Sequence, residues 1–182
     1  MAEKRKLSPV IFVPLERNLP TQTFRFWAAL FQQGWPYIHQ TYDQADVALN
    51  QGIYHFLSDT KFSHMVVLGM DHAHPPTVVH RLMRHIADDP DKQIVGGRNV
   101  IRVPPFKPAL YWLGDEGDMY GIEELTPGLV GPRAVIGMGC VAISREALET
   151  VGFPWFYNDW SDLKPGQFPS MDTQFCRRAI LK

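Results

Sequence analysis

The sequence VVLGMDHAHPP, at residues 66–76, joins an apolar run to an acid, two histidines and two prolines. A short apolar run is typical of a buried strand, and prolines are tolerated in the first turn of a helix. We therefore expect a buried strand over residues 64–70 and a helix over 75–89, which stops before Pro90. The polar residues that follow the strand directly are Asp71, His72 and His74.

Strands and helices are predicted to alternate on both sides of this stretch. Short apolar runs rich in β-branched residues predict strands at 9–13, 92–103 and 134–144. Apolar residues spaced three and four apart predict helices at 19–34, at 46–59, after Ser144 as N-cap, and from Met171 onward. This alternation predicts an α/β fold, a Rossmann-like and mainly parallel central sheet with helices on both faces.

Two segments carry no clear periodicity. Residues 104–134 are rich in proline and glycine, and a long excursion of this kind often carries function. Residues 157–170 are aromatic, polar and rich in proline and glycine, which predicts a loop.

The composition limits the classes of partner. The chain has 182 residues, which suits a single domain. Its 18 basic and 19 acidic residues give a net charge of -1, so no broad basic surface for nucleic acid or an anionic membrane is expected. Apolar runs stay well below the roughly 18 residues of a membrane-spanning helix. Two cysteines cannot form a disulfide scaffold, and we expect a soluble, cytoplasmic protein in a reducing setting.

The cluster of Asp71, His72 and His74 is the first candidate for chemistry. Carboxylate oxygens and imidazole nitrogens are ligands of divalent metals. Ligands in α/β sheets gather at the carboxyl ends of strands, where this cluster is expected. An alternative is that Asp71 or His72 accepts hydrogen bonds from free N–H groups at the start of the next helix. The spacing leaves both interpretations open.

Three further residues are candidates from their surroundings. Asp172, near the start of the last helix, could be a general base for an attacking hydroxyl or the N-cap of that helix, and its position alone favours the cap. Gly139 lets the backbone come close to a ligand or to another strand. Arg98 can contact phosphate, although a surface arginine without a partner is the more frequent case.

Taken in order, these segments resemble the GT-A fold glycosyltransferases of the family 2 type, in the nucleotide-diphospho-sugar transferase superfamily. The likeness covers most of residues 8–180. A first strand ends in a proline-containing loop, and the central strand ends where these enzymes carry an Asp-x-Asp metal motif. The remaining matching segments are QIVGGRNVIRVPPFKPALYW at 93–112, VIGMGCVAISREALETVGFPWF at 135–156 and SMDTQFCRRA at 170–179.

The resemblance implies transfer of a sugar from a nucleotide-diphosphate donor to a hydroxyl of a glycan, lipid or protein acceptor, with inversion. It implies that Asp71 holds Mn²⁺ or Mg²⁺ against the diphosphate, that His72 and His74 supplement it, and that Asp172 is the base. The nucleotide-sugar-binding residues expected on this basis are Pro14, Glu16, Asn50, Arg98 and Gly139.

The sequence departs from the family pattern in three places. The Asp-x-Asp motif reads Gly69-Met70-Asp71, so its first acid is missing, and the Glu that precedes the base in the family is Met171. The chain ends soon after Asp172, so the domain is expected to be short at its C-terminus. Two alternatives stay open: a non-catalytic nucleotide- or sugar-binding module of the same fold, and a metal-dependent hydrolase that uses the 71–74 cluster with further ligands from elsewhere.

Overall fold

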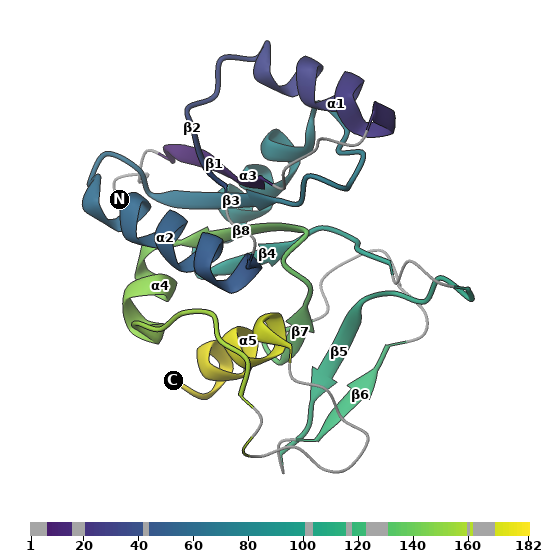
Figure 1. Cartoon of the computed structure of the whole chain (residues 1–182). Helices are drawn as coiled ribbons and strands as arrows, with labels where there is room; N and C mark the ends of the chain where they lie inside the picture. The colour runs from purple at the N-terminus through teal and green to yellow at the C-terminus, as the bar shows by residue number, and fades with distance from the viewer. Residues whose placement is uncertain are drawn as a thin grey trace.

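The computed structural model describes residues 7–15, 21–41, 44–100, 104–115, 118–122, 131–159, 161 and 170–182. Figure 1 shows how the helices and strands are arranged. The elements up to residue 96 are β1 (Pro9–Leu15), α1 (Thr21–Phe31), β2 (Tyr37–Thr41), α2 (Ala45–Ser58), β3 (His64–Leu68), α3 (Val78–Asp88) and β4 (Ile94–Gly96). Those after it are β5 (Leu110–Leu113), β6 (Met119–Gly121), β7 (Ala134–Ile136), β8 (Cys140–Ser144), α4 (Arg145–Val151) and α5 (Met171–Leu181).

The central sheet has five strands in the order β2-β1-β3-β8-β4. Strand β1 pairs in parallel with β2 and β3, whereas β8 runs antiparallel to both β3 and β4. Four of the five strands therefore point the same way. The prediction of a mainly parallel sheet is confirmed, with the antiparallel β8 as an addition that the sequence did not predict.

Strand β3 lies at the centre of the sheet, and all five of its residues are buried. Successive side chains of a strand point to opposite faces. Met65 and Val67 lie in a core with α2, α4 and α5, whereas Val66 and Leu68 lie in a second core with α1 and α3. Helices therefore cover both faces of the sheet, as predicted, and β3 is apolar throughout because both of its faces are buried.

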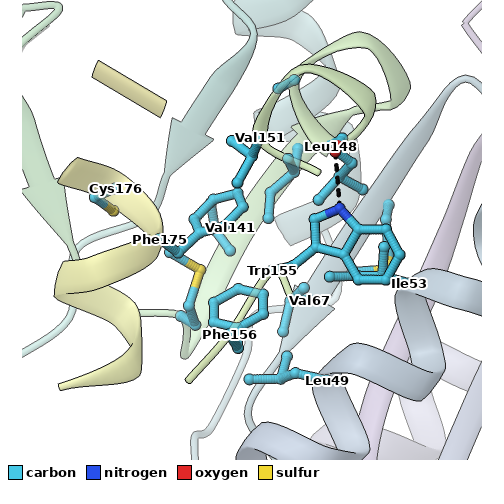
Figure 2. Close-up of a cluster of buried hydrophobic side chains, with 14 of the residues drawn as sticks. Leu49, Ile53, Val67, Val141, Leu148, Val151, Trp155, Phe156, Phe175 and Cys176 are labelled. Carbon is cyan, nitrogen blue, oxygen red and sulfur yellow. Dashed lines mark hydrogen bonds between the residues drawn. The ribbon is translucent and has the colours of Figure 1, made fainter. Parts of the chain in front are cut away.

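The segment after α4 closes the first of these cores. Trp155 and Phe156 are buried there, and the indole Nε1 of Trp155 donates to the Leu148 carbonyl oxygen at 2.8 Å. The ring of Phe156 stacks on Phe175 of α5 with 4.7 Å between centroids. Figure 2 shows how these aromatic side chains fill the space between α2, α4 and α5.

A second, antiparallel sheet of three short strands, in the order β6-β5-β7, follows the central one. In Figure 1 its strands β5 and β6 lie at the lower right, and β7 lies next to α5. Most of it falls in the 104–134 segment, whose strands of three or four residues are too short to show a period. The single strand predicted over 134–144 is in fact β7 and β8, which belong to different sheets and are separated by Gly137–Gly139.

Strand β2 was not predicted from the sequence. Its residues alternate between exposed and half-buried, and it lies at the edge of the sheet with β1 as its partner. An edge strand with a solvated face needs few apolar residues, so YIHQT lacks the apolar signal that marked the other strands.

Two side chains at the start of α4 organise nearby backbone. The Ser144 hydroxyl accepts a hydrogen bond from the Ala147 N–H at 2.9 Å, which confirms the predicted N-cap. Arg145 donates to four carbonyl oxygens at the end of α2 and in the turn after it, those of Phe56, Leu57, Asp59 and Phe62. Its guanidinium also lies 4.7 Å from the centre of the Phe56 ring.

No helix among the described residues is long and apolar enough to cross a membrane.

Candidate functional site

The candidate site lies at the edge of the central sheet where β3 ends and β8 begins. Asp71 and His72 follow β3, and Gly139 directly precedes β8. The Gly69 N–H donates to the Gly139 carbonyl oxygen at 2.8 Å, which continues the β3–β8 pairing beyond the strands. The site is therefore built at the carboxyl end of the central parallel strand, where α/β sheets commonly bind ligands.

Asp71 and His72 form a hydrogen-bonded pair. His72 Nδ1 and Asp71 Oδ1 lie 2.7 Å apart, and the two side chains are 31% and 23% exposed. Burial lowers the pKa of His72, which favours its neutral form. In that form the Nδ1–H donates a hydrogen bond to the Asp71 carboxylate, so Nε2 is left as a hydrogen-bond acceptor.

Gly69, where the first acid of the family motif is missing, has no space for a side chain. A Cβ atom there would lie 2.9 Å from His72 Nδ1, 3.0 Å from Asp71 Oδ1 and 3.3 Å from Gly139 Cα. The Asp71–His72 pair and the approaching backbone occupy the space that an acid at position 69 would need. A side chain at position 69 would therefore require the Asp71–His72 pair to shift.

His74 does not join that pair as a third ligand. Its side chain is buried, and its Nε2 lies 2.9 Å from the Gly69 carbonyl oxygen. Its ring stacks on His72 and contacts the Trp27 ring edge-on, with centroids 5.7 and 5.5 Å apart. Its pKa is lowered, chiefly by burial. The described part of the chain holds no group of three His, Cys, Asp or Glu side chains arranged for a metal ion, so the predicted three-ligand cluster is not formed.

The helix-capping alternative for the cluster gains no support from the start of the next helix. Helix α3 begins at Val78, its N-cap residue is Thr77, and this cap has no side-chain hydrogen bond. The loop before it is held instead by α1, because Thr23 Oγ1 and Trp27 Nε1 both donate to the Met70 carbonyl oxygen, at 3.2 and 3.1 Å. Asp71 and His72 thus lie on a loop that two hydrogen bonds from α1 hold in place.

Asp172 lies in the first turn of α5 and points at the turn between β7 and β8. Its Oδ2 accepts a hydrogen bond from the Met138 N–H at 3.0 Å. Its Oδ1 is buried and has no hydrogen-bond partner in the described structure. Burial raises the pKa of this carboxyl, and the Met138 N–H partly opposes the rise. The N-cap of α5 is Ser170, so the capping interpretation of Asp172 is wrong.

Asn99 belongs to the site and was not identified from the sequence. Its Nδ2 donates to the Gly137 carbonyl oxygen at 2.9 Å, and its Oδ1 faces Gly139. A Cβ atom on Gly139 would lie 3.3 Å from Asn99 Oδ1 and 3.1 Å from His72 Nε2, so both atoms border the same small space. The available signal was its position shortly after β4, at the edge where β3 also ends.

The turn of Gly137–Gly139 connects the two halves of the site. A Cβ on Gly137 would lie 3.6 Å from Asn99 Nδ2 and 3.8 Å from Asp172 Oδ2. Gly139 was predicted to allow close approach, and a Cβ there would meet His72 Cε1 at 2.8 Å. Asp71 and His72 thus lie on one side of this turn, Asp172 on the other, and Asn99 between them.

The other predicted binding residues are placed differently. Pro14 lies half-buried near the end of β1, in register with Gln40 of β2. Arg98 is exposed next to Asn99. Glu16 lies outside the described residues.

Asn50 is engaged elsewhere. Its Nδ2 donates to the carbonyl oxygens of Asp46 and Phe156, and its Oδ1 accepts from the N–H groups of Trp155 and Phe156. These bonds tie α2 to the segment after α4. A nucleotide contact would need an amide that these four bonds already use, so the contacts give that prediction no support.

The side chains that meet at the site are hydrogen-bond acceptors. His72 Nε2, Asn99 Oδ1 and the Asp172 carboxylate suit a ligand that presents hydroxyl groups. A diphosphate needs a cation there, and Mg²⁺ is typically bound by one or two carboxylates together with substrate phosphates. The Asp71 carboxylate fits that role, and carboxylate also suits Mn²⁺.

Comparison with known proteins supports the fold alone. No protein-family model and no curated protein matches the chain. The crystal structure of A197 from STIV is similar with a TM-score of 0.57 and 16% identity, over 83% of this chain and 72% of that one. CMP:2-keto-3-deoxy-manno-octonic acid synthetase complexed with CTP gives a TM-score of 0.44 and 14% identity, over 79% and 76%. The A197 match supports the α/β architecture, and identities this low carry no ligand or activity to this chain.

Proposed function

We propose that this chain is a glycosyltransferase that moves a sugar from a nucleotide-diphosphate donor to an acceptor hydroxyl. The proposal rests on one observation above all. Asp172, a half-buried carboxylate whose Oδ1 is buried without a described partner, lies across the Gly137–Gly139 turn from the Asp71–His72 pair, at the ligand-binding edge of an α/β sheet.

In this proposal the donor lies over the carboxyl ends of β1 and β3. Asp71 holds Mn²⁺ or Mg²⁺ at the diphosphate, with His72 fixing the orientation of the Asp71 carboxylate through their hydrogen bond. The ion, when bound, stabilises negative charge on the leaving group. In the same proposal Pro14 and Gly139 border the donor, and Arg98, which is exposed and precedes Asn99, contacts a phosphate.

Asp172 acts as the general base. The acceptor oxygen bonds to the anomeric carbon, the bond from that carbon to the diphosphate breaks, and the hydroxyl proton goes to Asp172. Burial makes a carboxylate a stronger base than one in water, because it disfavours the charged form. The Met138 N–H orients this carboxylate through its hydrogen bond to Oδ2.

The test is transfer and slow hydrolysis of UDP- and GDP-sugars with Mn²⁺ or Mg²⁺ present. Asp172→Asn and Asp71→Ala should each lower the rate by about 100-fold or more. Asp91→Asn, an exposed position in the turn before β4, is the matched control and should leave the rate unchanged. Full transfer by both site variants would contradict these roles.

A second candidate is a nucleotide- or sugar-binding module without transferase activity. The closed space at Gly69 favours it, because no first acid of the metal motif can be accommodated beside the Asp71–His72 pair. Calorimetry with UDP, GDP and their sugars, with and without Mn²⁺, separates the two. Binding without transfer or hydrolysis supports the module.

The metal-dependent hydrolase loses support. It needs at least two histidine ligands from the 71–74 cluster, whereas the Nε2 of His74 is bound to the Gly69 carbonyl oxygen. A bound metal with two imidazole ligands in a spectroscopic measurement would restore it.

A further inference from the structure

One peptide group connects Asn99 to Asp172. Asn99 Nδ2 donates to the Gly137 carbonyl oxygen at 2.9 Å, and the Met138 N–H donates to Asp172 Oδ2 at 3.0 Å. The Gly137 carbonyl and the Met138 N–H are the two ends of the same peptide bond. The three groups therefore form a continuous chain: amide donor, polarised peptide, carboxylate acceptor.

We infer that Asn99 is a positioning residue that acts on Asp172 through the Gly137–Met138 peptide, holding the carboxylate in place and strengthening the N–H bond it receives. Hydrogen bonds in a chain polarise one another. A donor on the carbonyl oxygen draws electron density from the peptide, which makes the N–H at its other end a better donor. The catalytic meaning of this link rests on the proposed function, whereas the link itself does not.

Asp172 is sensitive to this one donor because it has few others. Its Oδ1 has no described partner, and its surroundings are buried. A hydrogen bond to a carboxylate favours the charged form and opposes the effect of burial. A stronger Met138 N–H bond thus keeps more of the carboxyl ionised, which is the form that accepts a proton.

Asn99 itself is held in place. The Ala109 N–H donates to its backbone oxygen at 2.9 Å, and the next residue, Val100, forms an isolated bridge with Pro108. Since Nδ2 must face the Gly137 carbonyl, the orientation of the amide is determined. The side chain is therefore fixed at both ends, as a positioning role requires.

The test is a carbon-13 NMR titration of the Asp172 carboxyl in the whole chain. In Asn99→Ala its pKa should rise by about half to one pH unit, since the peptide loses its polarising donor. Gln33→Ala is the matched control, because its side-chain amide also donates to a backbone carbonyl, that of Pro76, but does not connect to Asp172, so the Asp172 pKa should stay constant.

Other groups near Asp172 can be separated in the same experiment. Cys176, on the same helix, has its pKa raised to about 12, chiefly by burial, and stays protonated across the acidic and neutral range. The titration of His72, which lies next to Gly139, can be followed separately through the resonances of its imidazole ring. The described parts of β7, of the 137–139 turn and of the stretch from Asn99 to Ala109 bring no other titratable side chain into contact with the Asp172 carboxyl.

An unchanged Asp172 pKa in folded Asn99→Ala would overturn the inference. If that variant does not fold, the unsubstituted chain decides: the Asn99 side-chain N–H resonances and the Met138 N–H should shift with the Asp172 titration, and a stationary Asn99 amide rejects the link. A raised pKa in Asn99→Ala together with full transfer by Asp172→Asn would keep the link and reject only the base.

Discussion

Arg145 and Asp172 are two charged side chains near the starts of helices, and their surroundings differ sharply. Arg145 donates to four carbonyl oxygens and lies over an aromatic ring, whereas Asp172 receives one described N–H bond and keeps one oxygen without a partner. Fully bonded charges hold a fold together, and an unsatisfied buried group needs another explanation, such as a catalytic role. Arg145 is therefore a structural charge, whereas the carboxylate of Asp172 is the one to which the proposed function assigns a role.

The largest expected effect tests the structural half of this comparison. Arg145→Met should lower the free energy of unfolding by about 2–4 kcal/mol, because it leaves the carbonyl oxygens at the end of α2 without their donors. Urea unfolding measures it. Arg84→Met, on the exposed side of α3, is the control and should stay within about 0.5 kcal/mol of the unsubstituted chain. Equal losses of stability in the two variants would show that the hydrogen bonds of Arg145 contribute no more than an exposed arginine does.

A smaller effect on stability is expected at the Gly137–Gly139 turn, which lies between Asp172 and the Asp71–His72 pair. Gly139→Ala places a Cβ 2.8 Å from His72 Cε1, so it should displace the ring, weaken its bond to Asp71 and cost about 1–3 kcal/mol. Gly137→Ala is the matched control, since its nearest neighbour would lie at an ordinary 3.6 Å. The His72 ring resonances report the displacement. If both alanine variants left those resonances in place, the crowding argument would be wrong.

The smallest expected effect concerns the charge of Asp172 and is seen in the pH dependence of the free energy of unfolding. The folded-state pKa of Asp172 lies above its ordinary value of 3.8, so this carboxyl stabilises the fold below the unfolded pKa and loses that contribution as pH rises through the folded pKa. Asn does not titrate. The free energy of unfolding of Asp172→Asn, minus that of the unsubstituted chain, should therefore increase from acidic to neutral pH. A difference that stays constant in urea unfolding across this range would contradict the raised pKa.

The sequence predicted the elements that depend on local burial. The apolar run of β3 marked a strand with two covered faces, and the spacing in α1, α2 and α3 marked their helices. It did not reveal β2, whose edge position needs few apolar residues, nor the division of 134–144 between two sheets. That division depends on which partner strands are available, which local patterns do not contain.

The residues of the candidate site divide in the same way, into those that local patterns indicate and those that only long-range contacts reveal. Asp71 and Asp172 were found because each follows a recognisable element boundary. Asn99 was missed because its role depends on Gly137, 38 residues away, as the role of Asp172 depends on Met138, 34 residues away. The misassignment of His74 has a similar cause, since only the folded loop shows its nitrogen beside the Gly69 carbonyl.

The crowding at Gly69 also constrains how this protein can change. An acid at that position collides with the Asp71–His72 pair, so Gly69→Asp alone disrupts the pair rather than completing the motif. A smaller residue at position 72 removes the imidazole and its hydrogen bond to Asp71. Positions 69 and 72 are therefore coupled: the double substitution should be tolerated better than Gly69→Asp alone, because it removes His72 Nδ1, the nearest atom to a Cβ at position 69.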